Sequence, residues 1–432
     1  MEGIFWDFFL LRDANAAWVL LGMICICVSS ALIGCFTFLK KQSLAGDAIA
    51  HAILPGVCVA FMWFETKSPF VLLVGAVVSG WLGMISIDYI QRHTRLKSDA
   101  ALALILSVFY GLGILLLTVI QRSGNAAQSG LDKFLFGKAA SMIKDDVQVF
   151  LGFSLLIMLV IFLSYKPLKL VIFDPGFAKA IGVNVKWWDF LVSFLTVIAI
   201  ALGVQAVGVV LMSALLIAPA TAARYWTRKL GVMLVLAALL AAVAGIIGAY
   251  ISYTIPKMPT GPWVVAILSF LAIFSVLIGL ENGYLRRLSK NYSHGRKMLE
   301  ENILKCMYHL GEPMEDFFQV YSIPQLQARR YIETNKLEIG IRRLKRKGWV
   351  QSTSDGILLT EEGLEEGKRV VRIHRLWEVY LSTYMKLPAD HVHENAEAME
   401  HVITPEIERE LEHQLAYPSK DPHASPIPYR QN

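Results

Sequence analysis

The chain changes character near residue 284, and this change limits the folds that are open to it. Residues 1–284 contain 32 of the 76 Asp, Glu, Lys and Arg residues, whereas the last 148 residues contain the other 44, balanced at 22 acidic and 22 basic. Eight of the ten histidines also follow residue 284. Long apolar runs with few charges are typical of transmembrane helices. The sequence therefore predicts a membrane part followed by a water-soluble part.

The apolar part contains enough residues for several membrane-spanning helices. A helix needs about 20 apolar residues to cross the hydrocarbon core. The segments that meet this requirement are approximately 17–39, 46–64, 69–90, 100–120, 147–164, 187–205, 207–223, 229–254 and 262–281. The sixth and seventh form one apolar stretch, which we expect to be broken by a glycine-assisted reversal within 203–208. We therefore predict an all-α polytopic membrane domain with about nine transmembrane helices.

Basic residues gather on one face of this arrangement. With nine spans, one side of the membrane receives the basic clusters at 40–41, 92–97, 166–186, 224–229 and 286–290. The positive-inside rule makes that side cytoplasmic. We therefore expect an extracytoplasmic N-terminus and a cytoplasmic C-terminal part. The net charge of +6 comes entirely from residues 1–284, so it describes membrane-flanking loops before it suggests nucleic-acid binding.

Two ionisable residues, Asp47 and His51, lie within the second predicted span. They are four positions apart, so they project from one helical face. Ionisable groups are costly in hydrocarbon and normally face a pore or a partner. A carboxylate with an imidazole suits Mn(II), Fe(II) or Zn(II). Pairing of Asp47 with Lys40 or Lys41 at the membrane interface is the structural alternative.

A short helix is predicted to begin at Asp174-Pro175, because Asp caps helices well and Pro fits their first turn. It lies between two spans on the basic face, where it could dock onto a soluble partner. An ordinary interfacial helix is the alternative. The sequence contains no G-x-x-x-x-G-K-[ST] phosphate-binding segment, and we find no nucleophile–base pair, so we do not expect an enzyme.

Three ordered segments resemble the metal-ion family of ABC importer permeases. They are 46–56 (GDAIAHAILPG), 173–183 (FDPGFAKAIGV) and 205–222, and the similarity covers about residues 15–284. The resemblance implies that Asp47 and His51 belong to the metal pathway. It also implies coupling to a separate ATPase subunit through Asp174, Pro175, Gly176, Ala180 and Gly182.

The same resemblance implies a set of partners and a location. The pore would be completed by a second permease copy or a related permease, and an extracytoplasmic metal-binding protein would deliver the ion. The membrane would be the bacterial inner (plasma) membrane. A divalent transition metal would be the substrate, with Mn(II) preferred and Fe(II) or Zn(II) possible.

The charged part begins with a basic, polar segment, 285–297, which we expect to be a linker. The sequence pattern predicts helices at 298–310, 322–330 and 336–347 and a β-hairpin at 349–359. This order predicts a winged-helix domain over 298–368. The residues available for DNA phosphates are Lys336, Arg342, Arg343 and Arg346. Glu338 on the same helix would repel phosphates.

Histidines and glutamates recur at helical spacing in residues 369–432. One pair is His374 and Glu378, and one stripe comprises His393, Glu397, Glu400 and His401. Two facing helices could present these side chains to one Mn(II) or Fe(II) ion, whereas a structural zinc site would favour thiolates. A solvated charged face is the alternative.

Residues of about 298–428 resemble the iron-dependent repressor family, which includes manganese-sensing regulators. The similarity lies in 371–378 (VRIHRLWE) and 393–402 (HENAEAMEHV). It implies that 369–432 is a small helical metal-binding and dimerisation domain. Asn302 and Lys305 stand where that family's first helix supplies a Met, Asp or Glu ligand, so Glu300 or Glu301 is the alternative ligand.

These expectations give three hypotheses, which differ in the role of the tail. In the first, the chain is a metal-ion ABC importer permease whose fused cytoplasmic domain senses the transported metal and inhibits uptake. In the second, the tail is a metal-dependent DNA-binding repressor. In the third, it is a structural dimerisation module.

Overall fold

The computed structural model describes residues 8, 13–42, 44–122, 137, 139, 142–255, 258–388, 392, 396–397, 399–401 and 403–429. Contacts between residues divide the chain into two compact units, Met1–Arg286 and Arg287–Asn432. The division falls close to the point where the composition changes.

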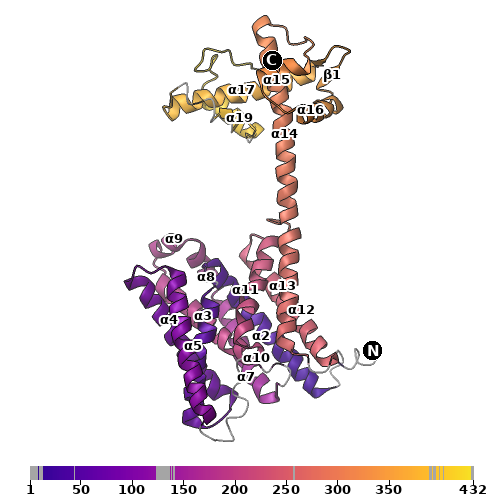
Figure 1. The fold of residues 1–432 in the computed structure, drawn as a ribbon. Coiled ribbons are helices and arrows are strands. Elements are labelled where there is room, and N and C mark those ends of the chain that lie inside the picture. The colour runs from indigo at the N-terminus through magenta and orange to yellow at the C-terminus, as the bar shows by residue number, and fades with distance from the viewer. Residues whose placement is uncertain are drawn as a thin grey trace. The chain divides into compact units, whose positions relative to one another are not determined.

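The first unit is helical wherever its described residues form regular structure (Figure 1). Eight of its helices are long and apolar enough to cross a membrane: α2 (Ala14–Leu39), α3 (Ala45–Phe64), α4 (Pro69–His93), α5 (Ser98–Arg122), α7 (Lys144–Leu163), α10 (Val185–Val207), α12 (Leu230–Thr254) and α13 (Thr260–Ile278). The seventh predicted span, 207–223, coincides with α11 (Val209–Trp226), which contains Pro219 and Arg224 and is not among the eight. Length and composition therefore support eight spans in the described part of the chain, where we predicted nine.

Small residues set the closest helix contacts of this unit. The helix α3 packs against α4 and α5, and α2 packs against α12, α7 and α11. A Cβ atom on Gly56 of α3 would lie 2.0 Å from the carbonyl oxygen of Gly75 on α4, so only glycine permits this approach. Gly208 separates α10 from α11 with φ of 95°, as the predicted glycine-assisted break requires.

Two short helices, α8 (Tyr165–Phe173) and α9 (Pro175–Ala180), connect α7 to α10. The side chain of Asp174 accepts a hydrogen bond of 2.8 Å from the backbone N–H of Phe177, and Pro175 occupies the first turn of α9. This confirms the predicted helix start. Ala178 packs inward with Val171 and Val185, so α9 is held against its neighbours by a small apolar cluster.

The second unit contains all but the first three residues of α14 (Tyr284–Gly311), together with α15 (Ile323–Arg329), α16 (Thr334–Arg346), β1 (Val350–Ser352), β2 (Ile357–Leu359), α17 (Glu361–Tyr384) and α19 (Pro405–Gln414). The two strands are antiparallel, with Val350 opposite Leu359. The helix that we predicted from residue 298 begins at Tyr284, so the predicted linker is helical. Its Leu, Arg and Lys residues are good helix formers, which explains the longer helix.

The core of the second unit is formed by the apolar faces of these helices. Leu337, Ile341 and Leu344 of α16 are buried, as their spacing predicts, and they pack with Leu304 of α14 and Val371 of α17. A smaller cluster joins Leu376 of α17, Leu411 of α19 and Ile427. The helices α14 and α17 therefore provide the frame on which the charged residues of the tail are arranged.

Candidate functional site

Asp47 and His51 lie together near the start of α3. Asp47 is in the first turn, where the helix dipole stabilises a negative charge. Its Oδ1 atom lies 3.9 Å from Nε2 of His51, and the His51 side chain is 18% exposed while that of Asp47 is 44% exposed. The ring of His51 meets Tyr110 of α5 edge to face, with 4.9 Å between ring centroids. The pair therefore shares one face, as the spacing predicts.

The surroundings of this pair leave it able to accept a cation. Lys40, one of the two basic residues considered as partners for Asp47, forms an ion pair of 2.7 Å with Asp189 of α10. The Nδ1 atom of His51 is buried and has no hydrogen-bond partner within the described residues. One carboxylate and one imidazole provide two donors, whereas Mn(II) or Zn(II) takes four or more. These two side chains alone would therefore fill only part of such a coordination shell.

The predicted coupling residues occupy the exposed side of α9 and its flanks. Exposed positions there are Asp174, Pro175, Gly176, Ala180 and Gly182. Three apolar side chains beside them, Phe173, Phe177 and Ile181, are each 54% exposed. Exposed aromatic and aliphatic groups rimmed by polar residues are typical of a surface that binds another protein or the membrane.

In the tail, the structure brings together four of the six predicted metal-ligating residues. His374 Nε2 lies 3.1 Å from Oε1 of Glu378, and His374 Nδ1 lies 2.5 Å from Oε2 of Glu400. His401 Nε2 lies 3.4 Å from Oε1 of Glu400. All four side chains are buried. His393 lies outside the described residues, and Glu397 instead forms an ion pair with Arg330.

A lysine occupies the middle of this cluster. The ammonium of Lys305, on α14, lies 2.7 Å and 3.1 Å from the two carboxylate oxygens of Glu400 and 3.1 Å from Nδ1 of His374. Glu301, one turn earlier on α14, accepts a hydrogen bond of 2.6 Å from Nδ1 of His401. Among the described residues, no group of three or more His, Cys, Asp or Glu side chains is placed to hold a metal ion. As arranged, these side chains form an ion-pair network and do not fit a divalent metal.

The electrostatics of the cluster follow from these contacts. Burial lowers the pKa of His374, but its hydrogen bonds to Glu378 and Glu400 outweigh burial, so the pKa of His374 is raised above its usual value. Burial raises the pKa of Glu400, but its contacts with His374 and Lys305 outweigh burial, so the pKa of Glu400 is lowered. The charged forms of both groups are therefore favoured.

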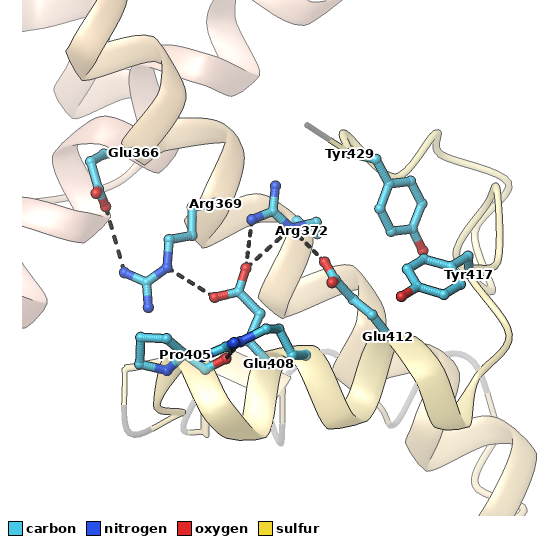
Figure 2. A pocket seen from close by; sticks show the side chains of 9 residues that line it. Glu366, Arg369, Arg372, Pro405, Glu408, Glu412, Tyr417 and Tyr429 are labelled. Atoms are coloured by element: carbon cyan, nitrogen blue, oxygen red, sulfur yellow. Dashed lines mark hydrogen bonds and ion pairs between the residues drawn. The ribbon is translucent and has the colours of Figure 1, made fainter. Parts of the chain in front are cut away.

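A second buried charge cluster was not foreseen from the sequence. It joins α17 to α19, and Figure 2 shows that Arg369 and Arg372 of α17 point toward Glu408 of α19. Arg372 lies 2.5 Å from Glu408 and 3.0 Å from Glu412, and Arg369 lies 2.9 Å from Glu408. The four-residue spacing of the two glutamates was the available signal. This cluster fixes the last helix of the tail.

The predicted DNA-contacting residues lie on α16. Lys336, Arg342 and Arg346 are exposed, and Arg343 is half-buried. Lys336 forms an ion pair of 3.0 Å with the exposed Glu333, and Arg342 donates a hydrogen bond to the carbonyl of Glu338. Exposed ion pairs of this kind contribute little to stability, so these side chains are available for other contacts.

Comparison with known proteins matches both parts of the chain. Residues 12–279 match the family described as the ABC 3 transport family, and residues 360–429 match the iron dependent repressor, metal binding and dimerisation domain. The manganese transport system membrane protein MntC of Bacillus subtilis is 36% identical over 378 residues, which are 87% of this chain and 86% of that protein. This match is longer than the first unit, so it continues into the second.

Two further proteins are similar to the membrane part. The zinc transport system membrane protein TroC of Treponema pallidum is 42% identical over 279 residues, which are 65% of this chain and 94% of that protein. A solved structure of PsaBC from Streptococcus pneumoniae in complex with Fab has a TM-score of 0.58 and 30% identity, and covers 65% of this chain and 98% of that chain. The chain therefore belongs to the ABC 3 transport family, as a membrane permease subunit that carries a C-terminal domain of the iron dependent repressor type.

Proposed function

We propose that this permease imports divalent transition-metal ions, with Mn(II) as the preferred substrate and Zn(II) or Fe(II) as alternatives. The observation that carries the proposal is the pairing of Asp47 with His51 inside an apolar helix bundle. Their borderline-hard donors suit these ions. The names of MntC and TroC, which refer to manganese and zinc transport, agree with this ligand chemistry.

The pathway requires more donors than one chain supplies at Asp47 and His51. We propose that a second permease copy, or a related permease, provides the remaining ligands, and that an extracytoplasmic metal-binding protein delivers the ion. A shell divided between two chains can open when the chains move apart, and transport requires binding that is weak enough for the ion to leave. The test is uptake of radioactive Mn(II) by proteoliposomes that contain the permease and its ATPase, competed by unlabelled Mn(II), Zn(II) and Fe(II). Competition by Mn(II) at the lowest concentration is expected, and uptake independent of ATP would contradict the proposal.

The orientation in the bacterial inner (plasma) membrane follows if α11 also spans the membrane, in addition to the eight helices named above. The N-terminus is then extracytoplasmic, and the soluble tail is cytoplasmic. Support comes from the basic residues, including Arg224 at the end of α11 and Lys166 and Lys169 on α8, which then share the cytoplasmic face.

We propose that α9 and its flanks form the docking surface for a separate ATPase subunit. Its exposed apolar side chains are the basis of this assignment. A helix held by a small buried cluster moves as a unit, so a displacement imposed by the ATPase at Phe177 would reach the start of α10 through Ala178 and Val185.

The substitution Phe177→Glu, which places a negative charge on this apolar surface, provides a direct test of it. We expect about tenfold lower ATP-dependent uptake, because one desolvated aromatic anchor typically contributes more than 1 kcal/mol to an interface. Co-purification of the ATPase should fall in parallel, while Phe177→Leu should retain most of both activities. Tyr331→Glu, at an exposed aromatic position of the tail, is the control. Normal uptake by Phe177→Glu would remove α9 from the interface.

A second candidate function belongs to the tail. The order of α14, α15, α16, β1 and β2 is that of a winged helix, and we propose a winged-helix domain over 298–368. The proposed domains of the chain are then the transmembrane permease domain, 1–284, a helical linker, 285–297, the winged helix and the repressor-like domain, 369–432. The exposed basic side chains of α16 favour binding to DNA phosphates. Metal binding by the six predicted residues of the tail remains a prediction. Lys305 contacts two of them, His374 and Glu400.

Gel-shift measurements on the full-length protein in nanodiscs test this second function. If α16 contacts phosphates, Arg342→Ala with Arg346→Ala weakens binding to all sequences alike and lowers the dependence of affinity on salt. Lys368→Ala is a control, because this basic residue lies on α17 and pairs with Glu365. The absence of any DNA shift at low salt would reject a DNA-binding tail.

A further inference from the structure

Lys305 is an unusual core residue, since it places a full positive charge inside the second unit. Its side chain is only 7% exposed. A buried ammonium is strongly unfavourable unless charged or polar partners surround it. Both carboxylate oxygens of Glu400 meet this need, at 2.7 and 3.1 Å, and the ring of His374 lies beside the ammonium, with Nδ1 3.1 Å away. The three residues come from α14, from α17 and from the segment just before α19, so the ammonium joins three parts of the fold.

The ammonium occupies the place that a divalent cation would need. A metal ion would have to bond to oxygens of Glu400 and to a nitrogen of His374, at the short distances typical of metal–ligand bonds. Both oxygens of Glu400 already contact Lys305. Both ring nitrogens of His374 already face carboxylates, Nδ1 at Glu400 and Nε2 at Glu378. A second cation would meet the positive charge of Lys305 at close range.

The remaining carboxylates around the cluster are neutralised in the same way. Glu301 contacts both His401 and Lys297. Two others are held by basic residues of neighbouring elements, Glu300 by Lys347 at 2.6 Å and Glu397 by Arg330. The carboxylates considered as metal ligands on α14 and in the segment 396–401 thus contact positive or imidazole groups of the chain itself.

We propose that the ammonium of Lys305 takes the place of a divalent cation in the tail, so that the repressor-like domain holds its His–Glu cluster together without metal. The junction of α14, α17 and residues 399–401 is then assembled at every metal concentration. This cluster would act as a permanent internal brace and would not report the level of the transported ion. The proposal concerns the second unit alone and is independent of metal binding at Asp47 and His51.

Hydrogen exchange followed by mass spectrometry tests the proposal on the full-length protein in nanodiscs. Peptides from α17 and from 396–404 report the tail locally, so metal bound in the membrane unit does not affect the readout. In the wild-type protein, saturating Mn(II) should leave the protection of these peptides unchanged. Removal of metal by a chelator should also leave it unchanged.

Replacement of the lysine provides the second arm. Lys305→Met keeps most of the length of the side chain but removes the charge, so protection of α17 should fall in the absence of metal. Mn(II) should then restore it, with about tenfold higher protection when free Mn(II) is ten times its dissociation constant. Lys305→Arg, which retains a cation, should remain protected without metal.

Two results would overturn the proposal. One is a gain of protection in the wild-type protein on addition of Mn(II) that Glu400→Gln removes, because the metal would then displace the ammonium. The other is a Lys305→Met protein that is as protected as the wild type and indifferent to Mn(II). The first arm requires no Lys305 variant to fold, so it decides the question even if Lys305→Met is unfolded.

Discussion

We expect uptake of Mn(II) to fall about 100-fold or more when Asp47 or His51 is replaced by Ala. Each replacement removes one of the two donors that this chain offers near the start of α3, where their side chains lie 3.9 Å apart. Removing a residue that only hydrogen-bonds to a metal ligand typically lowers affinity or activity by about 10–100-fold. Removing a donor itself should therefore lower uptake by about 100-fold or more. The measurement is ATP-dependent uptake of radioactive Mn(II) by proteoliposomes that contain the permease and its ATPase.

The neighbouring helix α4 offers matched controls for these two substitutions. Asp88 pairs with Arg92, and His93 stacks on Tyr89, and all four side chains lie at the exposed end of α4. Asp88→Ala and His93→Ala therefore remove the same chemical groups without changing the α3 pair. Both control variants should retain most of the uptake. If Asp47→Ala and His51→Ala retained as much, the ion would follow another route and the proposed pathway would be wrong.

The largest expected effect on stability is in the tail, at Glu408. Its carboxylate accepts hydrogen bonds from Arg369 and Arg372, and Arg372 is only 4% exposed (Figure 2). Glu408→Ala leaves the buried guanidinium with Glu412 as its remaining carboxylate. Breaking a buried ion pair by removing one partner costs about 3–5 kcal/mol, and the contact with Glu412 places this case near the lower limit. We therefore expect the free energy of unfolding of the tail to fall by about 3 kcal/mol.

Hydrogen exchange of peptides from α17 and α19, measured over a range of urea concentrations, gives this free energy for the tail within the full-length protein. Glu410→Ala is the matched control, because Glu410 lies on the same helix with its side chain exposed. It should change stability by less than about 0.5 kcal/mol. Equal effects of the two substitutions would show that the Arg–Glu cluster does not hold α19 in place.

Several features of the fold follow from local sequence patterns. Apolar length locates the helices of the membrane unit, and the match to the ABC 3 transport family confirms the resemblance carried by the three ordered segments. The cap at Asp174 and the buried stripe of α16 also agree with prediction, because both depend on residues within one or two turns of each other. The count of spans was less secure, since α11 combines apolar residues with Pro219 and Arg224.

The charged residues of the tail were harder to place from the sequence. Helical spacing indicated that His374 could meet Glu378, and the structure places them 3.1 Å apart. Spacing within one helix gave no information on which charged residue of another helix would contact His374 and Glu400. That residue is Lys305 of α14. The match of residues 360–429 confirms the repressor-type domain, but it begins after Lys305 and therefore says nothing about that residue.

The sequence by itself determined that the chain has a lipid-facing and a water-facing part, and that Asp47 and His51 share one face. Both conclusions depend on composition and on the period of a helix, which are local properties. Only the tertiary structure decided that Lys305 lies against His374 and Glu400, which are 69 and 95 residues away in the chain. The physical reason is that the partner of a buried charge is chosen by the packing of separate helices, and no local pattern specifies that packing.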